Sequence, residues 1–157
     1  MDELNIGSAF DSAMAFGVVG SITVAQDGAI YSAHPDEGEV RVWSRDGQPV
    51  RTLGRPGAGP GEFLGLGAIG LRGDTLWAID SRAWRVTYFD HEGEVLGTVH
   101  LPGDSRAPVS DPTSGPARPR HLLSDGGFYA VQTAVLPQVA GLDSTVVRHL
   151  NLAPDLR

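Results

Sequence analysis

The chain has 157 residues, of which 41% are apolar, and it carries 21 glycines, 11 prolines, no cysteine and a net charge of −7. This length and composition predict one globular domain. The negative charge argues against a nucleic-acid partner, because neutralising phosphates requires clustered Lys and Arg. The lack of cysteine excludes disulfides, thiolate metal sites and cysteine nucleophiles.

The sequence indicates neither a membrane span nor secretion. No apolar run approaches the length needed to cross a bilayer. The first residues, 1–5, lack the basic and then apolar pattern of a secretory signal. A signal further upstream would be missing from this chain if it is a fragment, so the localisation stays unknown.

Residues 1–19 form a lead-in that contains a short alternating piece, residues 4–6, followed by small residues with weak periodicity. From Ser21 the pattern becomes regular and predicts four antiparallel strands at residues 22–24, 29–33, 39–44 and 48–53. Asp-Gly pairs at 27–28 and 46–47 separate alternating runs, and such pairs favour hairpins because the matching turn needs positive φ. We therefore expect a meander.

The segment 54–61 holds four glycines and two prolines in eight residues and is followed by Glu62 and Phe63. Glycine carries excess backbone entropy and proline lacks a backbone donor, so this run does not fit the interior of a helix or sheet. It predicts a connector of fixed shape that joins two copies of one unit.

The second copy is predicted as strands at residues 66–71, 75–80, 84–89 and 94–101. It overlays on the first copy without a gap at a shift of about 46 residues, which places Gly47 on Gly93 and Trp43 on Phe89. A four-stranded meander that repeats every forty to fifty residues is the unit of a β-propeller blade. Since no long stretch has a 3.6-residue period, we expect almost no helix.

After the second copy the composition changes. Residues 102–119 are rich in Pro, Ser, Asp, Gly and Arg and predict an exposed insert. A third unit follows with strands at about 121–123, 128–136 and 145–152, and it ends before a fourth strand.

These residues together resemble a known family. The run 53–63, preceded by Trp43-Ser44-Arg45-Asp46-Gly47, resembles the NHL-type repeat of six-bladed β-propellers, which has an aromatic strand end, Asp-Gly, a further strand and a Gly-rich connector closing in Gly-Pro-Gly-Glu-Phe. In the second copy, Asp80 and Arg85 are similar to the family's Asp, loop and Arg-Val pattern. The first copy departs from it, with His34 and Glu39 at those positions, and the second copy is followed by the Pro-rich insert instead of a Gly-rich connector.

The resemblance implies an all-β fold of propeller blades, each a four-stranded antiparallel meander. It assigns residues 1–19 to a lead-in with a possible ring-closing strand at 4–6, 20–65 to blade 1, 66–101 to blade 2, 102–119 to the insert and 120–157 to an incomplete blade 3. Six such units need about 280 residues. The chain therefore resembles the N-terminal part of a propeller, a partial ring of about two and a half blades.

Few residues suggest chemistry. The five histidines show no metal-ligand spacing, and the Gly-x-Ser-x-Gly turn of an exposed serine nucleophile is absent. Asp80 and Arg85 are best interpreted as a charge pair that braces a turn. The large aromatic residues fall at matched positions and are expected in the core between blades: Tyr31, Trp43, Trp77, Trp84, Tyr88 and Phe89.

Ligands of propellers usually bind at one mouth of the central channel, which the innermost strands line. Those strands offer Ser21, Thr23 and Gly70, which are small and unreactive. The ionisable candidates for ligand binding at the channel mouth are Glu62, Arg120 and His121. We expect no catalytic residue, metal ligand or cofactor, because the oxygen donors that a hard cation needs are missing from these strands.

Two functions stay open at this stage. The first is a non-enzymatic propeller scaffold that binds a protein, peptide or carbohydrate and that self-associates through open blade edges. The second is a fragment of a propeller enzyme, a lyase or metal-dependent hydrolase, whose remaining site residues lie in missing blades. Fold alone does not decide between them.

Overall fold

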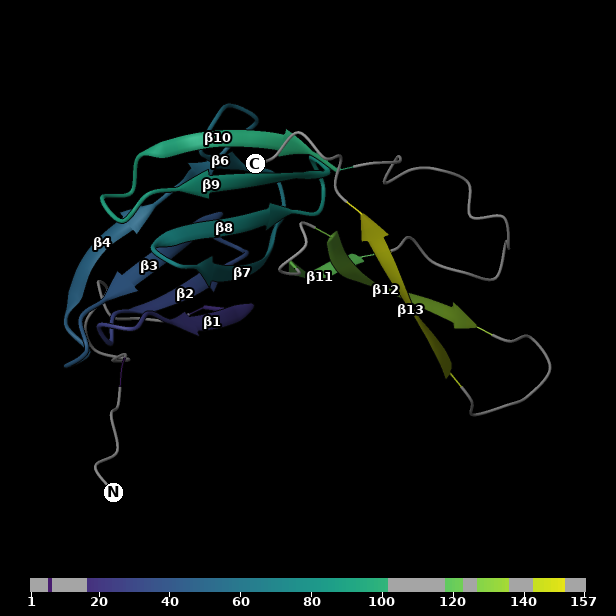
Figure 1. The fold of residues 1–157 in the computed structure, drawn as a ribbon, viewed down its shortest axis with the longest axis horizontal. Coiled ribbons are helices and arrows are strands. Elements are labelled where there is room, and N and C mark those ends of the chain that lie inside the picture. Colours follow the sequence, from purple (N-terminus) through teal and green to yellow (C-terminus); the bar gives the residue numbers. More distant parts are fainter. Residues whose placement is uncertain (1–5, 7–16, 102–117, 123–126, 136–142, 152–157) are drawn as a thin grey trace, which may run out of the picture. The chain divides into compact units, whose positions relative to one another are not determined.

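A computed structural model describes residues 6, 17–101, 118–122, 127–135 and 143–151 of the chain (Figure 1). All regular structure in these residues is β-strand, so they include no helix that is long and apolar enough to cross a membrane. The chain divides into two compact units, residues 1–99 and residues 100–157.

The first meander consists of β1 (Ser21–Val24), β2 (Ile30–His34), β3 (Glu39–Trp43) and β4 (Pro49–Leu53), which pair in sequence order. Both predicted Asp-Gly turns are confirmed. Gly28 and Gly47 have φ of 91° and 77°, and their amides donate to the carbonyls of Ala25 and Ser44 at 3.0 and 2.9 Å. Positive φ at these two positions is what the hairpins require.

The second meander consists of β7 (Leu66–Arg72), β8 (Thr75–Asp80), β9 (Arg85–Phe89) and β10 (Val95–His100). Its two middle strands match those of the first meander at the 46-residue shift, since Ile30 pairs with Trp43 and Leu76 pairs with Phe89. The innermost strand departs from the gap-free alignment. Ser32 pairs with Ile22, whereas its counterpart Ala78 pairs with Ile69 and not with Ala68.

This one-residue difference arises from the first hairpin of each meander. The pair Val24 and Ile30 encloses five residues, and the corresponding pair Leu71 and Leu76 encloses four. The β7–β8 register then shifts between Leu66 and Ile69, where the ladder has an irregularity. The shorter hairpin is thus compensated by the irregularity between Leu66 and Ile69, and the pairing of the other strands is unchanged.

The direction of the strands gives unit 1 two ends. The hairpins after β1, β3, β7 and β9 lie at one end, here called the hairpin end. The β2–β3 loop, the β8–β9 loop and the segment 54–65 lie at the other end, here called the connector end. The connector also contains a short parallel pair, β5 (Arg55–Pro56) with β6 (Glu62–Phe63), which sequence analysis did not predict.

The two meanders pack face to face, and their facing side chains form the core of unit 1. The buried members of this cluster are Ala33, Val40, Val42, Leu53, Phe63, Leu66, Ile69, Leu76, Ala78 and Phe89. The innermost strands β1 and β7 are neighbours, and the Ser21 hydroxyl oxygen accepts a hydrogen bond from the Ile69 amide at 3.0 Å. Ser21 therefore joins two blades.

The opposite face of the first meander is buried along β2 and β3, where Ser32, His34 and Trp43 are at most 3% exposed, and is open at its two outer strands, β1 and β4. It carries Ile22, Val24 and Val50, which are 62%, 61% and 53% exposed. By strand pairing, Ile22 is the counterpart of Ile69, which is only 6% exposed because it packs on the first meander. The same sheet position is thus buried in one meander and open to solvent in the other.

The predicted aromatic core between blades is confirmed for Phe89, a member of the core cluster, and for Tyr31, which packs against it, whereas Trp43 and Trp77 are buried but are not members of that cluster. Trp43, Trp77 and Phe89 are at most 3% exposed. Tyr31 and Tyr88 are half-buried, and burial raises the pKa of both phenols. Trp84 is a correction: it lies before β9, in the β8–β9 loop, and is only partly buried.

Unit 2 contains one antiparallel sheet in the order β11 (Arg118–Leu122), β12 (Gly127–Val135) and β13 (Asp143–Asn151). Within the described residues no strand pairs with the outer edge of β13. Nearly all of the predicted insert lies outside the described residues, and so does the predicted ring-closing strand 4–6 apart from Ile6.

Candidate functional site

The connector is held in shape by its own side chains and by glycine conformations. Gly54 and Gly61 adopt φ of 81° and 72°, which a residue with a Cβ atom rarely does. The Phe63 ring then packs near the Phe89 ring, with centroids 6.2 Å apart and planes tilted by 44°. Gly61 and Phe63 of the Gly-Pro-Gly-Glu-Phe run therefore have structural roles.

Glu62 lies within this connector, and its carboxylate is engaged there. Its Oε1 atom accepts from Arg55 Nε at 2.8 Å, and its Oε2 atom accepts from the Gly59 amide at 2.8 Å. The hydrogen bond from Gly59, together with that from Arg55, lowers the pKa of Glu62. Glu62 thus closes the connector loop as a carboxylate.

Asp80 organises the connector end from a fully buried position. Its Oδ2 atom accepts from the Leu64 amide at 2.8 Å, and its Oδ1 atom accepts from Gly65, Arg82 and Ala83 at 2.9 to 3.0 Å. Four backbone donors compensate the buried charge. One carboxylate therefore ties the β8–β9 loop to the connector.

Arg85 completes this arrangement from the first position of β9. Its guanidinium donates to the carbonyls of Ala58, Gly59 and Glu62 at 2.7 to 2.9 Å and lies 3.9 Å from Asp80. The interpretation of Asp80 and Arg85 as a charge pair and turn brace agrees with this geometry, which also reaches further than expected, to the connector. We call these two residues the clamp.

The side chains that the connector end presents to solvent include three from the segments that Asp80 holds. Leu64 is 48% exposed, Arg82 is exposed and Trp84 is partly exposed. The Arg82 guanidinium has no hydrogen bond or ion pair to any residue that the structure describes. Sequence analysis missed Leu64 and Arg82 because neither belongs to a motif.

Trp84 has an unusual backbone. Its φ is 54°, the sole positive φ of a residue other than glycine in the described part of the chain. A left-handed conformation costs a residue with a Cβ atom about 1–3 kcal/mol. The residue at the same place in the first meander is Gly38, with φ of 65°, so aligning the two copies at Gly38 was the clue that sequence analysis overlooked.

The other two predicted site residues, Arg120 and His121, lie on β11 of unit 2, and both are exposed. Among the residues described, no group of three or more His, Asp or Glu side chains is placed to hold a metal ion. Inner-strand residues Thr23 and Gly70 contribute no ionisable group. Gly70 instead leaves room for the Trp77 ring, which a Cβ atom would overlap.

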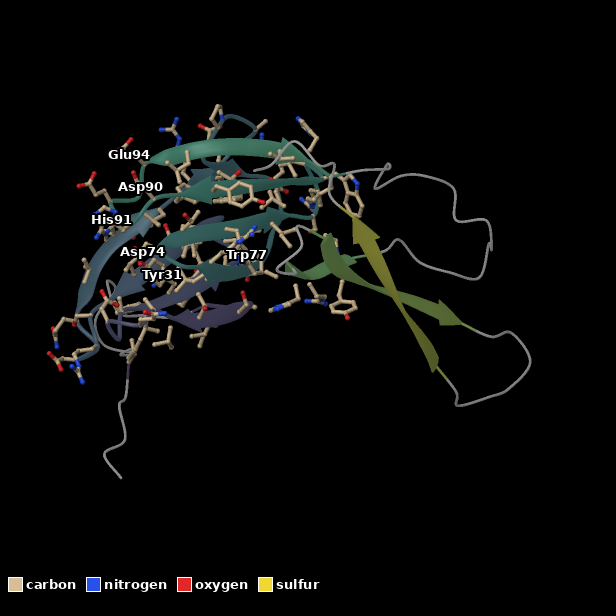
Figure 2. The ribbon with its side chains drawn as sticks, viewed as in Figure 1. Tyr31, Asp74, Trp77, Asp90, His91 and Glu94 are labelled. Atoms are coloured by element: carbon tan, nitrogen blue, oxygen red, sulfur yellow. The ribbon has the colours of Figure 1, made fainter. Side chains whose placement is uncertain are left out.

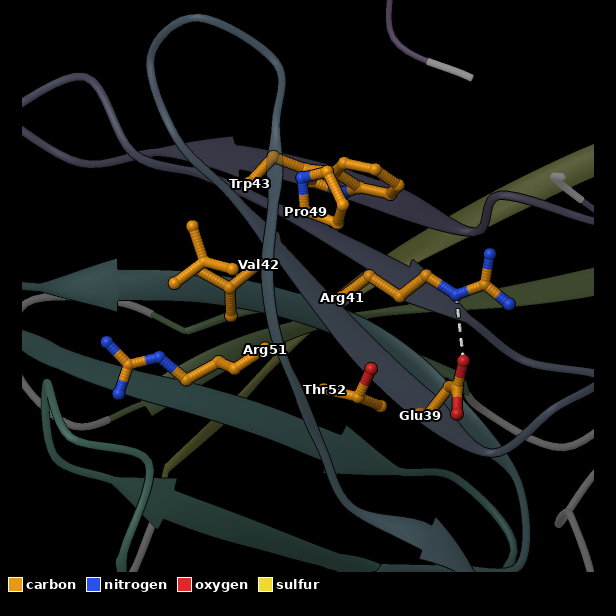
Figure 3. A pocket seen from close by; sticks show the side chains of 8 residues that line it. Glu39, Arg41, Val42, Trp43, Pro49, Arg51 and Thr52 are labelled. Carbon is orange, nitrogen blue, oxygen red and sulfur yellow. Dashed lines mark hydrogen bonds and ion pairs between the residues drawn. The ribbon is translucent and has the colours of Figure 1, made fainter. Parts of the chain in front are cut away.

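A hollow of about 320 Å³ lies on strands β3 and β4 of the first meander (Figure 3). It is lined by Glu39, Arg41, Val42, Trp43, Pro49, Val50, Arg51 and Thr52. Within it, Arg41 Nε donates to Glu39 Oε1 at 2.8 Å. Two of the charged groups of the hollow thus pair with each other, whereas Arg51 donates to the Glu92 carbonyl at 2.6 Å. Val50, on the same wall, is exposed.

The hairpin end is acidic. Figure 2 shows Asp74, Asp90 and Glu94 at this end of the sheets, with His91 beside them. Asp90 accepts hydrogen bonds from the amides of Glu94 and Glu92 at 2.9 Å, and the bond from Glu94 contributes most to lowering its pKa. Asp90 thus shapes its hairpin turn, as expected for a residue of this type.

No protein-family model matches this sequence, and no curated protein sequence matches it. Solved structures do share the fold. A protein from Bacteroides fragilis NCTC 9343 has a TM-score of 0.59 at 19% identity, with 81% of this chain covering 32% of that one. The arrangement is that of a partial β-propeller.

Two further solved structures give lower scores. Streptogramin B lyase has a TM-score of 0.49 at 13% identity, over 85% of this chain and 40% of that one. The Swd1 β-propeller domain of Myceliophteria thermophila has a TM-score of 0.47 at 14% identity, over 83% of this chain and 39% of that domain. This chain therefore spans about a third to two fifths of the length of the structures it matches. At such identities the likeness concerns the fold alone.

Proposed function

We propose that this chain is part of an NHL-like, six-bladed β-propeller that serves as a binding scaffold for a protein, peptide or carbohydrate and catalyses no reaction. In this proposal residues 20–65 and 66–101 are two blades and 120–157 an incomplete third. The parts of the NHL-like connector have defined roles in positioning the second blade, which supports the family assignment.

The observation that carries the proposal is the state of the charged groups at the connector end. The side chains of Asp80, Arg85 and Glu62 form hydrogen bonds mainly with backbone groups of the same loops. General acid–base catalysis needs a group within reach of substrate and free to exchange a proton. The exposed Leu64 and Arg82 are instead suited to recognition.

The ligand site proposed here is the channel mouth, with Glu62, Arg120 and His121 as candidates. Glu62 contributes chiefly by fixing the connector, and Arg120 and His121 are both exposed. The second candidate function is a fragment of a propeller lyase or metal-dependent hydrolase. It is favoured only by the length of the chain, which leaves room for site residues on further blades.

A binding survey of the full chain tests the scaffold function. A random twelve-residue peptide library displayed on phage and an array of carbohydrates should yield ligands with dissociation constants of about 1–100 μM. Calorimetric titrations with Ca²⁺ and Zn²⁺ should give nothing tighter than about millimolar. A micromolar constant for either ion would favour the enzyme hypothesis, and the absence of any peptide or carbohydrate ligand would contradict the scaffold.

A further inference from the structure

We propose that Leu64, Arg82 and Trp84 form a docking surface for an extended peptide that carries an acidic residue beside an apolar one. We call these three residues the docking triplet. The inference rests on the proposed scaffold function and narrows it to one surface and one class of ligand.

The three residues are held by one buried group. Asp80 accepts the Leu64 amide on one carboxylate oxygen and the Arg82 amide on the other, at 2.8 and 3.0 Å. It also accepts the Ala83 amide, next to Trp84, at 2.9 Å. Because the Asp80 side chain is fully buried, the backbone under the triplet is fixed before any ligand arrives, which lowers the entropic cost of binding.

Trp84 occupies a place that the first meander fills differently. A Cβ atom on Gly38 would lie 3.2 Å from the Pro56 nitrogen, so the connector passes directly over that loop. The second meander has a large aromatic side chain at this point, on a left-handed backbone, and the chain beyond β10 has no Gly-rich connector of the same kind. Such backbone outliers cluster at ligand clamps, where function offsets their cost.

The charge of Arg82 indicates the kind of ligand that the triplet would bind. The aliphatic part of Arg82 lies against Gly65, where a Cβ atom would be 2.7 Å from Arg82 Cγ. Its guanidinium has no partner among the residues that the structure describes. Asp80 is neutralised by Arg85 and backbone donors, and Glu62 by Arg55. The remaining carboxylates of the connector end belong to the other meander: Asp36 and Glu37 lie in its β2–β3 loop, and Glu39, at the start of β3, pairs with Arg41.

The triplet therefore combines a cation that has no partner among the described residues with two apolar side chains that are partly exposed. Arginine and tryptophan are the residues most enriched at binding hot spots. A carboxylate of the ligand would pair with Arg82, and a neighbouring apolar side chain would lie against Leu64 and Trp84. A sugar acid could satisfy Arg82 but would leave Leu64 without an apolar partner, so we commit to a peptide.

The test uses the full chain and the random twelve-residue peptide library. Peptides enriched on the wild type should contain Asp or Glu next to a large apolar residue. Trp84→Gly and Arg82→Glu should each weaken these peptides at least tenfold, as measured by fluorescence anisotropy. Arg45→Glu, a charge reversal of an exposed arginine at the hairpin end, should change their affinity less than twofold.

Thermal melting separates binding from folding. Trp84→Gly should melt no lower than the wild type, because glycine adopts positive φ without strain. A marked fall in its melting temperature would show that Trp84 is a packing residue and would overturn the proposal. Equal affinity of the peptides for wild type, Trp84→Gly and Arg82→Glu would also overturn it while leaving the scaffold intact, as would ligands found only on the carbohydrate array. Failure of both screens would contradict the scaffold itself.

Discussion

The two meanders share one frame of strands and hydrophobic positions but differ in the polar groups at the connector end. The second meander pairs Asp80 with Arg85 across β8 and β9, and the first pairs His34 with Glu39 at the corresponding place on β2 and β3. His34 Nε2 lies 2.9 Å from the Ser32 hydroxyl, which also accepts from Trp43 Nε1 at 2.9 Å. The first meander thus has a largely internal side-chain network where the second has the clamp.

This difference corresponds to a difference between the segments that precede the two blades. The clamp binds the segment that precedes its own blade, because Arg85 donates to carbonyls of residues 58, 59 and 62. The segment that precedes the first blade, residues 8–19, has no Gly-Pro-Gly-Glu-Phe run, and the first meander has no Asp and Arg at the clamp positions. The Gly-rich connector and the clamp therefore act as one device, since each supplies the partners of the other.

Replacing Asp80 by Ala should have the largest effect on stability. Four backbone donors and Arg85 would lose their buried partner, and removing one member of a buried charge pair costs about 3–5 kcal/mol, a large part of a typical domain's stability. Urea denaturation followed by tryptophan fluorescence would measure it. Asp90→Ala is the matched control, because Asp90 also accepts backbone amides but is only partly buried, and it should cost far less.

Arg85→Lys should have the next largest effect. Lysine keeps the charge but lacks the planar fork that reaches three carbonyls, and each lost hydrogen bond to a charged group is worth about 1.5–3 kcal/mol. We expect a loss of about 2 kcal/mol and faster hydrogen exchange of the Glu62 and Leu64 amides. Arg51→Lys, which affects an exposed contact to the Glu92 carbonyl, is the control. If hydrogen exchange of the Glu62 and Leu64 amides is unchanged in Arg85→Lys, the clamp does not stabilise the connector.

The strand frame could be predicted from sequence because alternation and Asp-Gly turns are local properties. The positions of Trp43 and Phe89 followed directly from the repeat. The one-residue offset of Ile69 did not, since a hairpin that is one residue shorter is compensated by a bulge that leaves no pattern in the residues. Registers of innermost strands depend on such compensation.

The candidate site was less accessible from sequence. The Asp80 and Arg85 pair was visible as a charge pair, but its partners are backbone groups, which any residue provides. Trp84 was assigned to a strand because aromatic residues favour strands, whereas the loop geometry set by Asp80 places it before β9. Glu62 lies in the connector and its carboxylate contacts Arg55 and Gly59 there, while its role in ligand binding stays a prediction.

The third prediction concerns the pH dependence of stability that His34 of the first meander contributes. Burial lowers the pKa of His34 in the folded protein, and Arg41 lowers it further while Glu37 and Glu39 oppose the shift. The unfolded chain therefore binds a proton more readily, so stability is complete above about pH 6.5 and falls as the pH decreases toward the folded pKa. Urea midpoints at pH 7.5 and 5.5 would measure the loss. His34→Asn should be less stable but should show a smaller difference between the two midpoints, and an unchanged difference would place the acid sensitivity elsewhere.

The smallest effect on stability, and a clear effect on association, is expected for Ile22→Lys. Ile22 is 62% exposed, so the substitution should change the free energy of unfolding by less than about 0.5 kcal/mol. Its counterpart Ile69 packs against a neighbouring blade, and the surface around Ile22 and Val24 is of the same kind but has no blade packed on it within the described residues. We expect the wild type to self-associate at high micromolar concentration through this face, because exposed apolar patches favour protein contacts, and Ile22→Lys to remain monomeric. Leu96→Lys on β10 removes an equally exposed residue, 60% against 62%, and should associate like the wild type. Light scattering of the three proteins measures their association. A monomeric wild type would contradict self-association through this face. Equal association of the two variants would show that the contact lies on another surface, such as the outer edge of β13.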